Sequence, residues 1–94
     1  MAKPKIILDV PMEDLLDILS DKGWDVVTVT KELGSTTEAR ADTNILNYAK
    51  NNPNVIVVTV DKPFVSRLRS AGVKVVALDM VDRARIIDEK LKLL

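Results

Sequence analysis

Two aspartates stand at the same place relative to an apolar run of the sequence. Asp9 follows Ile6-Ile7-Leu8, and Asp61 follows the longer run from Val55 to Val60. Each run is typical of a buried strand, and the carboxyl ends of parallel strands form the ligand crevice of an open α/β sheet. Carboxylates that meet there repel one another unless a cation lies between them. The pair therefore predicts one shared site for a divalent cation.

Asp42 is the third candidate ligand, at the start of a predicted helix that follows the second strand. From there it can lean over the same crevice, so that three oxygen donors converge. A structural role competes with this interpretation, because an aspartate at a helix N-cap accepts hydrogen bonds from free backbone N–H groups. That alternative applies both to Asp42 and to Asp61. Glu13, close to Asp9 in the sequence, is a reserve ligand.

The composition restricts which metal could bind. The chain of 94 residues has no cysteine and no histidine, so neither a thiolate nor an imidazole ligand is available. A site built only from oxygen suits Mg²⁺ or Mn²⁺ better than zinc or copper. Fourteen basic and fourteen acidic residues cancel, which argues against the broad positive field of a nucleic-acid coat protein.

No segment has the pattern of a membrane span or of a secretion signal. The apolar runs are far shorter than the roughly 20 residues that cross a bilayer, and the charged N-terminal residues lead directly into the first strand. We therefore expect a cytoplasmic protein without a membrane partner.

Four apolar, β-branched segments alternate with four amphipathic ones along the chain. This alternation predicts an α/β fold: a single three-layer domain over residues 1–94, with a four-stranded parallel sheet of order 2-1-3-4 and helices on both faces. The strands are expected at 5–8, 25–29, 55–60 and 73–78, with a loop at 33–37 and helices at 12–22, 41–52, 62–71 and 80–94. In that order the first and third strands are neighbours, which brings Asp9 beside Asp61.

Segments of the chain resemble the PIN-like nuclease domains, in particular the short PIN-like proteins of bacterial and archaeal toxin–antitoxin operons. The resemblance covers nearly the whole chain and rests on four segments in register: Ile6-Ile7-Leu8-Asp9, Gly23-Trp24-Asp25-Val26, the segment from Ala41 to Ala49 (ADTNILNYA), and the segment from Val57 to Phe64 (VVTVDKPF).

This resemblance implies a Mg²⁺- or Mn²⁺-dependent endoribonuclease, in which acidic side chains hold the metal and an activated water attacks an RNA phosphodiester. By the matching motifs, Asp9, Asp42 and Asp61 would be the catalytic metal ligands or would orient metal-bound water. Thr59 would support them by a hydrogen bond to a ligand carboxylate. An RNA substrate and an antitoxin protein are the partners that the resemblance implies.

The chain also departs from the family pattern. Val10 and Pro11 stand where members commonly have a Glu-Asn pair, and Val60 and Pro63 stand where they commonly have an arginine and a further aspartate. A catalytically degenerate PIN-like domain that serves as a protein-interaction module is therefore the alternative function. A receiver-like signalling domain is a third reading, but the chain lacks the paired acids and the lysine that it requires.

The remaining side chains have predicted structural roles. Phe64 should lie in the core, and Trp24 should pack at the amino-end edge of the sheet. Asp79 and Asp82 should cap a helix end and be exposed to solvent. The inward stripe of the last helix is expected to contain Val81, Ala84, Ile87, Leu91 and Leu94. Its second apolar face, with Met80, Ile86 and Leu93, fits a homodimer contact, a seat for an antitoxin helix, or packing within the monomer.

Overall fold

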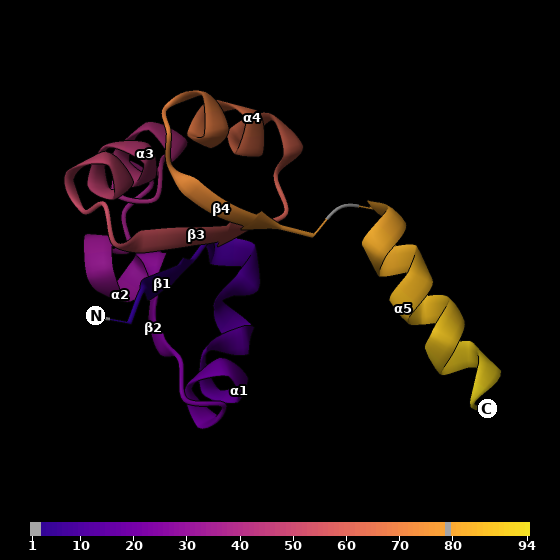
Figure 1. The fold of residues 1–94 in the computed structure, drawn as a ribbon. Helices are drawn as coiled ribbons and strands as arrows, with labels where there is room; N and C mark the ends of the chain where they lie inside the picture. Colours follow the sequence, from indigo (N-terminus) through magenta and orange to yellow (C-terminus); the bar gives the residue numbers. More distant parts are fainter. Residues whose placement is uncertain (1–2, 79) are drawn as a thin grey trace.

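The computed structural model of the chain describes residues 3–78 and 80–94, in which four strands alternate with helices (Figure 1). The elements in chain order are β1 (Lys5–Leu8), the 3₁₀-helix η1 (Val10–Leu15), α1 (Leu16–Asp21), β2 (Asp25–Thr28), α2 (Val29–Leu33), α3 (Asp42–Asn51), β3 (Val55–Thr59), α4 (Lys62–Ser70), β4 (Lys74–Ala77) and α5 (Met80–Lys92). None of the helices in these ranges combines the length and the hydropathy of a bilayer-spanning segment.

The four strands form one parallel sheet in the order β2-β1-β3-β4, as predicted. Leu8, the last residue of β1, lies opposite Thr28 of β2 and Val58 of β3. The strands therefore end almost level with one another. As a result, the residues that follow β1 and β3 leave the sheet at the same edge.

Alternate residues of the strands enter two separate hydrophobic clusters, one on each face. On one face, Ile7 and Val57 pack with side chains of α2, α3 and α4, and the large side chains Ile45, Phe64 and Leu68 are fully buried. Figure 1 shows α3 and α4 together above the sheet. The predicted core position of Phe64 is confirmed.

On the other face, Ile6 and Leu8 pack with Met12 of η1, and three leucines of η1 and α1 surround them. Helices thus cover both faces, as the predicted three-layer arrangement requires. These helices contact β1, β2 and β3. On this face Ile56 and Val58 of β3 are half-buried, and Val76 of β4, which points the same way, is 51% exposed.

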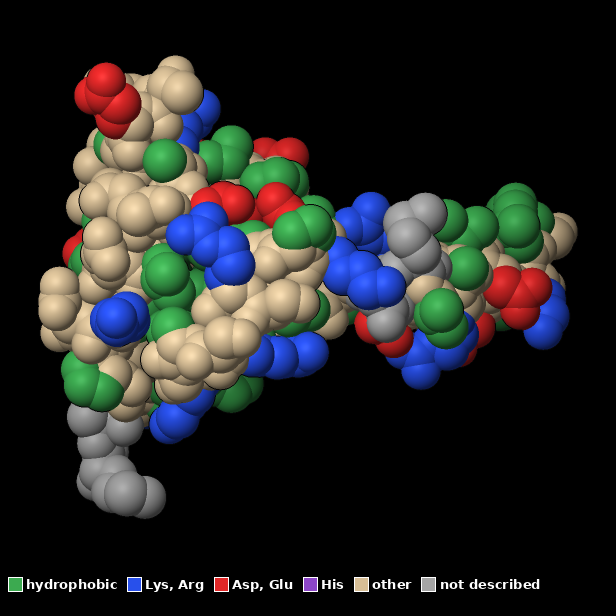
Figure 2. Space-filling view, turned by 90° about the horizontal axis from the view of Figure 1, so that it is seen from above, with side chains coloured by type: hydrophobic (Ala, Val, Ile, Leu, Met, Phe, Trp, Pro, Cys, Tyr) green, Lys and Arg blue, Asp and Glu red, His purple; other side chains and the backbone are tan. Residues whose placement is uncertain are grey.

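The expected inward stripe of the last helix is wrong, because α5 projects away from the sheet (Figures 1 and 2). The largest of its apolar side chains are exposed, with Val81 at 76% and Leu91 at 61%. The radius of gyration is 14.2 Å, compared with roughly 12 Å for a compact chain of this length. Of the predicted second apolar face, Leu93 is exposed and Ile86 is partly exposed, and the side chain of Met80 lies outside the described residues.

Two local features differ from the expected elements. Residues 29–33 form the short helix α2, where the end of a strand and the start of a loop were expected; Thr28 begins it by accepting a hydrogen bond from the backbone N–H of Lys31. The first predicted helix is a 3₁₀-helix followed by α1, with Pro11 in its first turn. Trp24 is 48% exposed, so its predicted packing at the sheet edge is at most partial.

Candidate acidic site at the carboxyl ends of the strands

An open hollow of about 490 Å³ lies at the edge where β1 and β3 end. All three predicted site residues line it, and they come from three different elements: Asp9 follows β1, Asp42 begins α3, and Asp61 follows β3. The other lining residues are Val10, Pro11, Thr37, Arg40 and Ala41. The structure therefore brings together the side chains that the sequence predicts to share a site.

Asp9 is buried and held on both carboxylate oxygens. Oδ1 accepts a hydrogen bond from the backbone N–H of Val10 at 2.9 Å, and Oδ2 accepts one from the hydroxyl of Thr59 at 2.7 Å. A carboxylate oxygen can accept two hydrogen bonds or ligate a metal with its remaining lone pair. Asp9 thus has a fixed orientation and retains acceptor capacity.

Asp61 is the N-cap of α4, since its Oδ1 accepts a hydrogen bond from the backbone N–H of Phe64 at 3.2 Å. Its own backbone N–H donates to the Thr59 hydroxyl oxygen at 3.2 Å. Thr59 therefore lies between the two strand-end aspartates and bonds to both. The predicted capping role of Asp61 and the predicted hydrogen bond from Thr59 to a site carboxylate are both confirmed.

Asp42 is not a helix cap, so that structural alternative is wrong. Ala41, in an extended conformation, is the N-cap of α3, and its carbonyl oxygen accepts the first backbone hydrogen bonds. Asp42 consequently occupies the first helical position. Among the described residues, no group donates a hydrogen bond to its carboxylate. This leaves both of its oxygens available to a ligand at the hollow.

Electrostatics also connect Asp42 with the other two acids. Its pKa is raised above the ordinary value of 3.8, first by burial and then by the negative charges of Asp61 and Asp9. Arg67, which donates a hydrogen bond to Thr43, lowers the pKa without reversing this outcome. The ionised form of Asp42 is thus disfavoured in the folded chain, and a proton or a cation relieves that cost.

Within residues 3–78 and 80–94, no three acidic side chains lie close enough to ligate one metal ion together. Simultaneous direct ligation by Asp9, Asp42 and Asp61 requires a change of rotamer, or water molecules between the ion and a carboxylate. Mg²⁺ commonly retains several of its waters and binds through only one or two carboxylates. The donor set therefore fits a hydrated cation better than a closed cage.

Glu13, the reserve ligand, has a different role. Its two carboxylate oxygens accept hydrogen bonds from the backbone N–H and the hydroxyl of Thr30, each at 2.8 Å. Arg40 also donates to that hydroxyl, at 2.8 and 3.2 Å, and its guanidinium lies 3.9 Å from Glu13. Glu13 does not line the hollow, and instead it fixes Thr30 and Arg40.

Arg40 is the site residue that the sequence reasoning missed. It lines the hollow beside the acids and its side chain is 38% exposed. Two features of the sequence could have indicated it: it lies two residues before Asp42, and it is the sole arginine of the first 47 residues.

The two acids after the fourth strand do not add to the site. Asp82 pairs with Arg85 on α5, and Asp79 lies outside the described residues.

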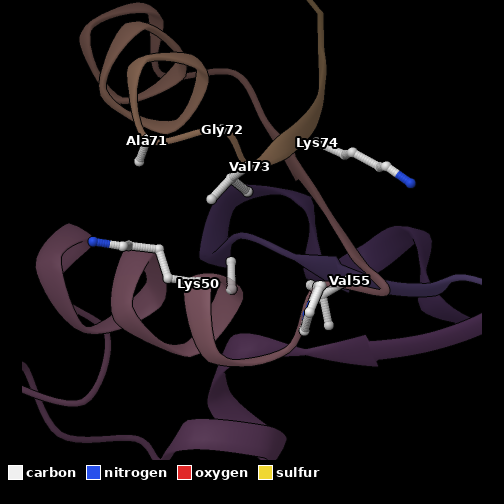
Figure 3. A pocket seen from close by; sticks show the side chains of 8 residues that line it. Lys50, Val55, Ala71, Gly72, Val73 and Lys74 are labelled. Atoms are coloured by element: carbon white, nitrogen blue, oxygen red, sulfur yellow. The ribbon is translucent and has the colours of Figure 1, made fainter.

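A smaller hollow of about 180 Å³ lies at the opposite end of the sheet, between the ends of α3 and α4 and the start of β4. Lys50 and Lys74 line it without any acidic side chain, and Figure 3 shows their side chains directed away from each other. No pair of groups converges there on a ligand. The acidic hollow is therefore the candidate functional site.

Comparisons with models of protein families, with curated proteins and with solved structures gave no match to this chain.

Proposed function

We propose that this protein is a Mg²⁺- or Mn²⁺-dependent endoribonuclease of the PIN-like type, with Asp9, Asp42 and Asp61 as its acidic site. The observation that carries the proposal is the convergence of these carboxylates on one open hollow, where the charges of Asp9 and Asp61 help to raise the pKa of Asp42. RNA as the substrate comes from the resemblance of the motifs.

The chemistry of the donor set supports a hard divalent cation. Carboxylate oxygen is the ligand that Mg²⁺ and Mn²⁺ prefer, and a cation at the hollow would relieve the repulsion that disfavours ionised Asp42. When bound, such an ion orients a phosphate group, lowers the pKa of a coordinated water and offsets charge on the leaving oxygen.

The protein's own groups have separate tasks around that ion. Thr59 holds the Asp9 carboxylate in place, and the capping bond to Phe64 holds that of Asp61. Arg40, fixed at the rim by Thr30, supplies a positive charge that attracts the RNA phosphate. This charge partly replaces the arginine that family members commonly carry before the last aspartate.

The test is metal-dependent cleavage of single-stranded RNA by the wild type and by Asp61→Asn. Asparagine caps helices about as well as aspartate, so the variant keeps its fold while it loses the charge. We expect Mn²⁺-dependent cleavage by the wild type and its loss in Asp61→Asn. Asp25→Asn, at the opposite end of β2, is the matched control and should cleave normally. Equal cleavage by wild type and Asp61→Asn would refute the assignment.

A protein-interaction module without catalytic activity is the second candidate. Two observations favour it: no three described acids are close enough to ligate one ion, and the apolar residues of α5 are exposed as if to bind a partner such as an antitoxin. This candidate predicts no turnover on any RNA and no stabilisation by Mn²⁺. The same cleavage and melting experiments therefore distinguish the two functions.

A further inference from the structure

Arg67 is the second arginine that the fold brings next to the acidic hollow. It belongs to α4, the helix that Asp61 caps, and its guanidinium donates a hydrogen bond to the hydroxyl of Thr43 at 3.1 Å. Thr43 follows Asp42 directly in α3, and the positive charge of Arg67 lowers the pKa of Asp42. Because Arg67 does not line the hollow itself, it lies just outside, on the side of Asp42. Figure 2, which looks onto α3 and α4, shows basic and acidic side chains next to one another.

Most of the hydrogen-bonding capacity of Arg67 is unused. A guanidinium has five N–H donors in a planar fork. Among the described residues, that of Arg67 makes the one hydrogen bond to Thr43 and no ion pair. The side chain is exposed, so the remaining donors are open to a ligand. Such a fork matches the oxygens of a phosphate, to which arginine commonly donates two parallel hydrogen bonds.

The charge balance around the hollow favours a second arginine at a phosphate site. The three aspartates of the site are negative, and Glu13 adds a fourth carboxylate, 3.9 Å from Arg40. A divalent cation and Arg40 together supply three positive charges against these four. The negative charge that remains repels an RNA phosphate, and the charge of Arg67 cancels it.

We propose that Arg67 is a second phosphate-binding residue of this site, so that a single-stranded RNA lies across the acids with one phosphate at Arg40 and another at Arg67. This inference rests on the proposed function and extends it to the way in which the substrate is held. The phosphate at the acids lies between the two contacts. The described residues that line the hollow include no aromatic ring on which a base could stack. The RNA is therefore held by its backbone, with little preference for sequence.

The experiment measures RNA binding by Arg67→Gln in an Asp61→Asn background, which does not cleave. Fluorescence anisotropy of a labelled single-stranded RNA at several salt concentrations gives the affinity and the slope of log K against log salt. We expect weaker binding and a slope that is shallower by about 0.7, for one lost phosphate contact. Arg67→Lys keeps the charge and should keep the slope. Arg69→Gln is the matched control, because it removes the same charge from the same helix at a different hollow and should leave the slope unchanged.

The outcomes separate this inference from the proposed function. A slope that changes in Arg40→Gln but not in Arg67→Gln would overturn the inference alone, because RNA would bind at the hollow without reaching Arg67. A melting temperature lowered by loss of the bond to Thr43, with an unchanged slope, would show a structural role and overturn it too. An equal change of slope in Arg69→Gln would also overturn it.

Two further outcomes concern the function itself. An unchanged slope in both Arg40→Gln and Arg67→Gln would overturn the inference and the proposed function together, because RNA would not lie at the acids. The expected change of slope in Arg67→Gln, combined with no Mn²⁺-dependent cleavage by the wild type, would support the RNA contact and refute the nuclease.

Discussion

The hydroxyl of Thr59 lies 2.7 Å from Oδ2 of Asp9, at a fully buried position between the ends of β3 and β1. The same hydroxyl oxygen accepts a hydrogen bond from the backbone N–H of Asp61. One side chain thus satisfies a buried carboxylate and fixes the start of the segment that leads into α4. The site and the fold therefore depend on the same hydrogen bond.

Replacing Thr59 by valine should destabilise the protein by about 1–3 kcal/mol, because valine keeps the shape but leaves a buried carboxylate oxygen without a donor. The melting temperature should fall by roughly 4–8 °C per kcal/mol. Urea unfolding provides the free energy of unfolding, with Thr59→Ser as the control that retains the hydroxyl. The prediction fails if the valine variant is as stable as the serine variant.

Much of the fold could be predicted because its signals are local and repeated. The β-branched run from Val55 and the apolar run at 6–8 alternate along the chain with segments whose apolar residues recur at helical spacing. This alternation predicts a parallel sheet. The sheet order then brings Asp9 next to Asp61 through register alone. These two inferences needed only the periodicity of the strands. The hydrogen bond of Thr59 to a site carboxylate was expected from the resemblance of the motifs, and the structure has it to Asp9.

The remaining features depend on contacts that no sequence window contains. Asp42 is at the first helical position and not at the cap because the backbone of Ala41 turns one residue earlier. Glu13 is bound by Thr30, which is 17 residues away in the sequence. The outward direction of α5 leaves its apolar side chains exposed, whereas its apolar stripe alone indicates only that the helix packs against something.

The raised pKa of Asp42 predicts a pH dependence of stability. The folded chain binds the proton on Asp42 more tightly than the unfolded chain, so ionisation costs stability. This cost is absent well below pH 3.8 and grows as the pH rises through the folded pKa of Asp42. Asp42→Asn removes it. The stability of the variant relative to the wild type should therefore increase with pH across that window, as measured by urea unfolding at several pH values.

A carboxyl titration by NMR checks the physical cause. Asp61→Asn removes one negative charge while it keeps the cap, so the pKa of Asp42 should fall. It should stay above 3.8, because burial is the larger cause of the shift. An unchanged pKa would mean that the two carboxylates do not interact across the hollow.

Mn²⁺ should raise the melting temperature of the wild type. At a metal concentration ten times the dissociation constant, binding stabilises the folded state by about 1.4 kcal/mol, which corresponds to roughly 6–11 °C. Asp42→Asn should lose most of this shift without unfolding, since its carboxylate makes no hydrogen bond among the described residues. Asp25→Asn should keep the full shift. A thermal shift that is the same in both variants would show that the metal binds elsewhere.

Arg40 should bind RNA phosphate, and Arg40→Gln tests this in an Asp61→Asn background that does not cleave. The affinity for single-stranded RNA should fall, and the slope of log K against log salt should become shallower by about 0.7 for one lost phosphate contact. Lys50→Gln is the charge-matched control, because Lys50 lies at the opposite end of the sheet. Fluorescence anisotropy at several salt concentrations measures both quantities. If Lys50→Gln changes the slope as much as Arg40→Gln, the RNA does not lie over the acidic hollow, because charge alone and not position then determines binding.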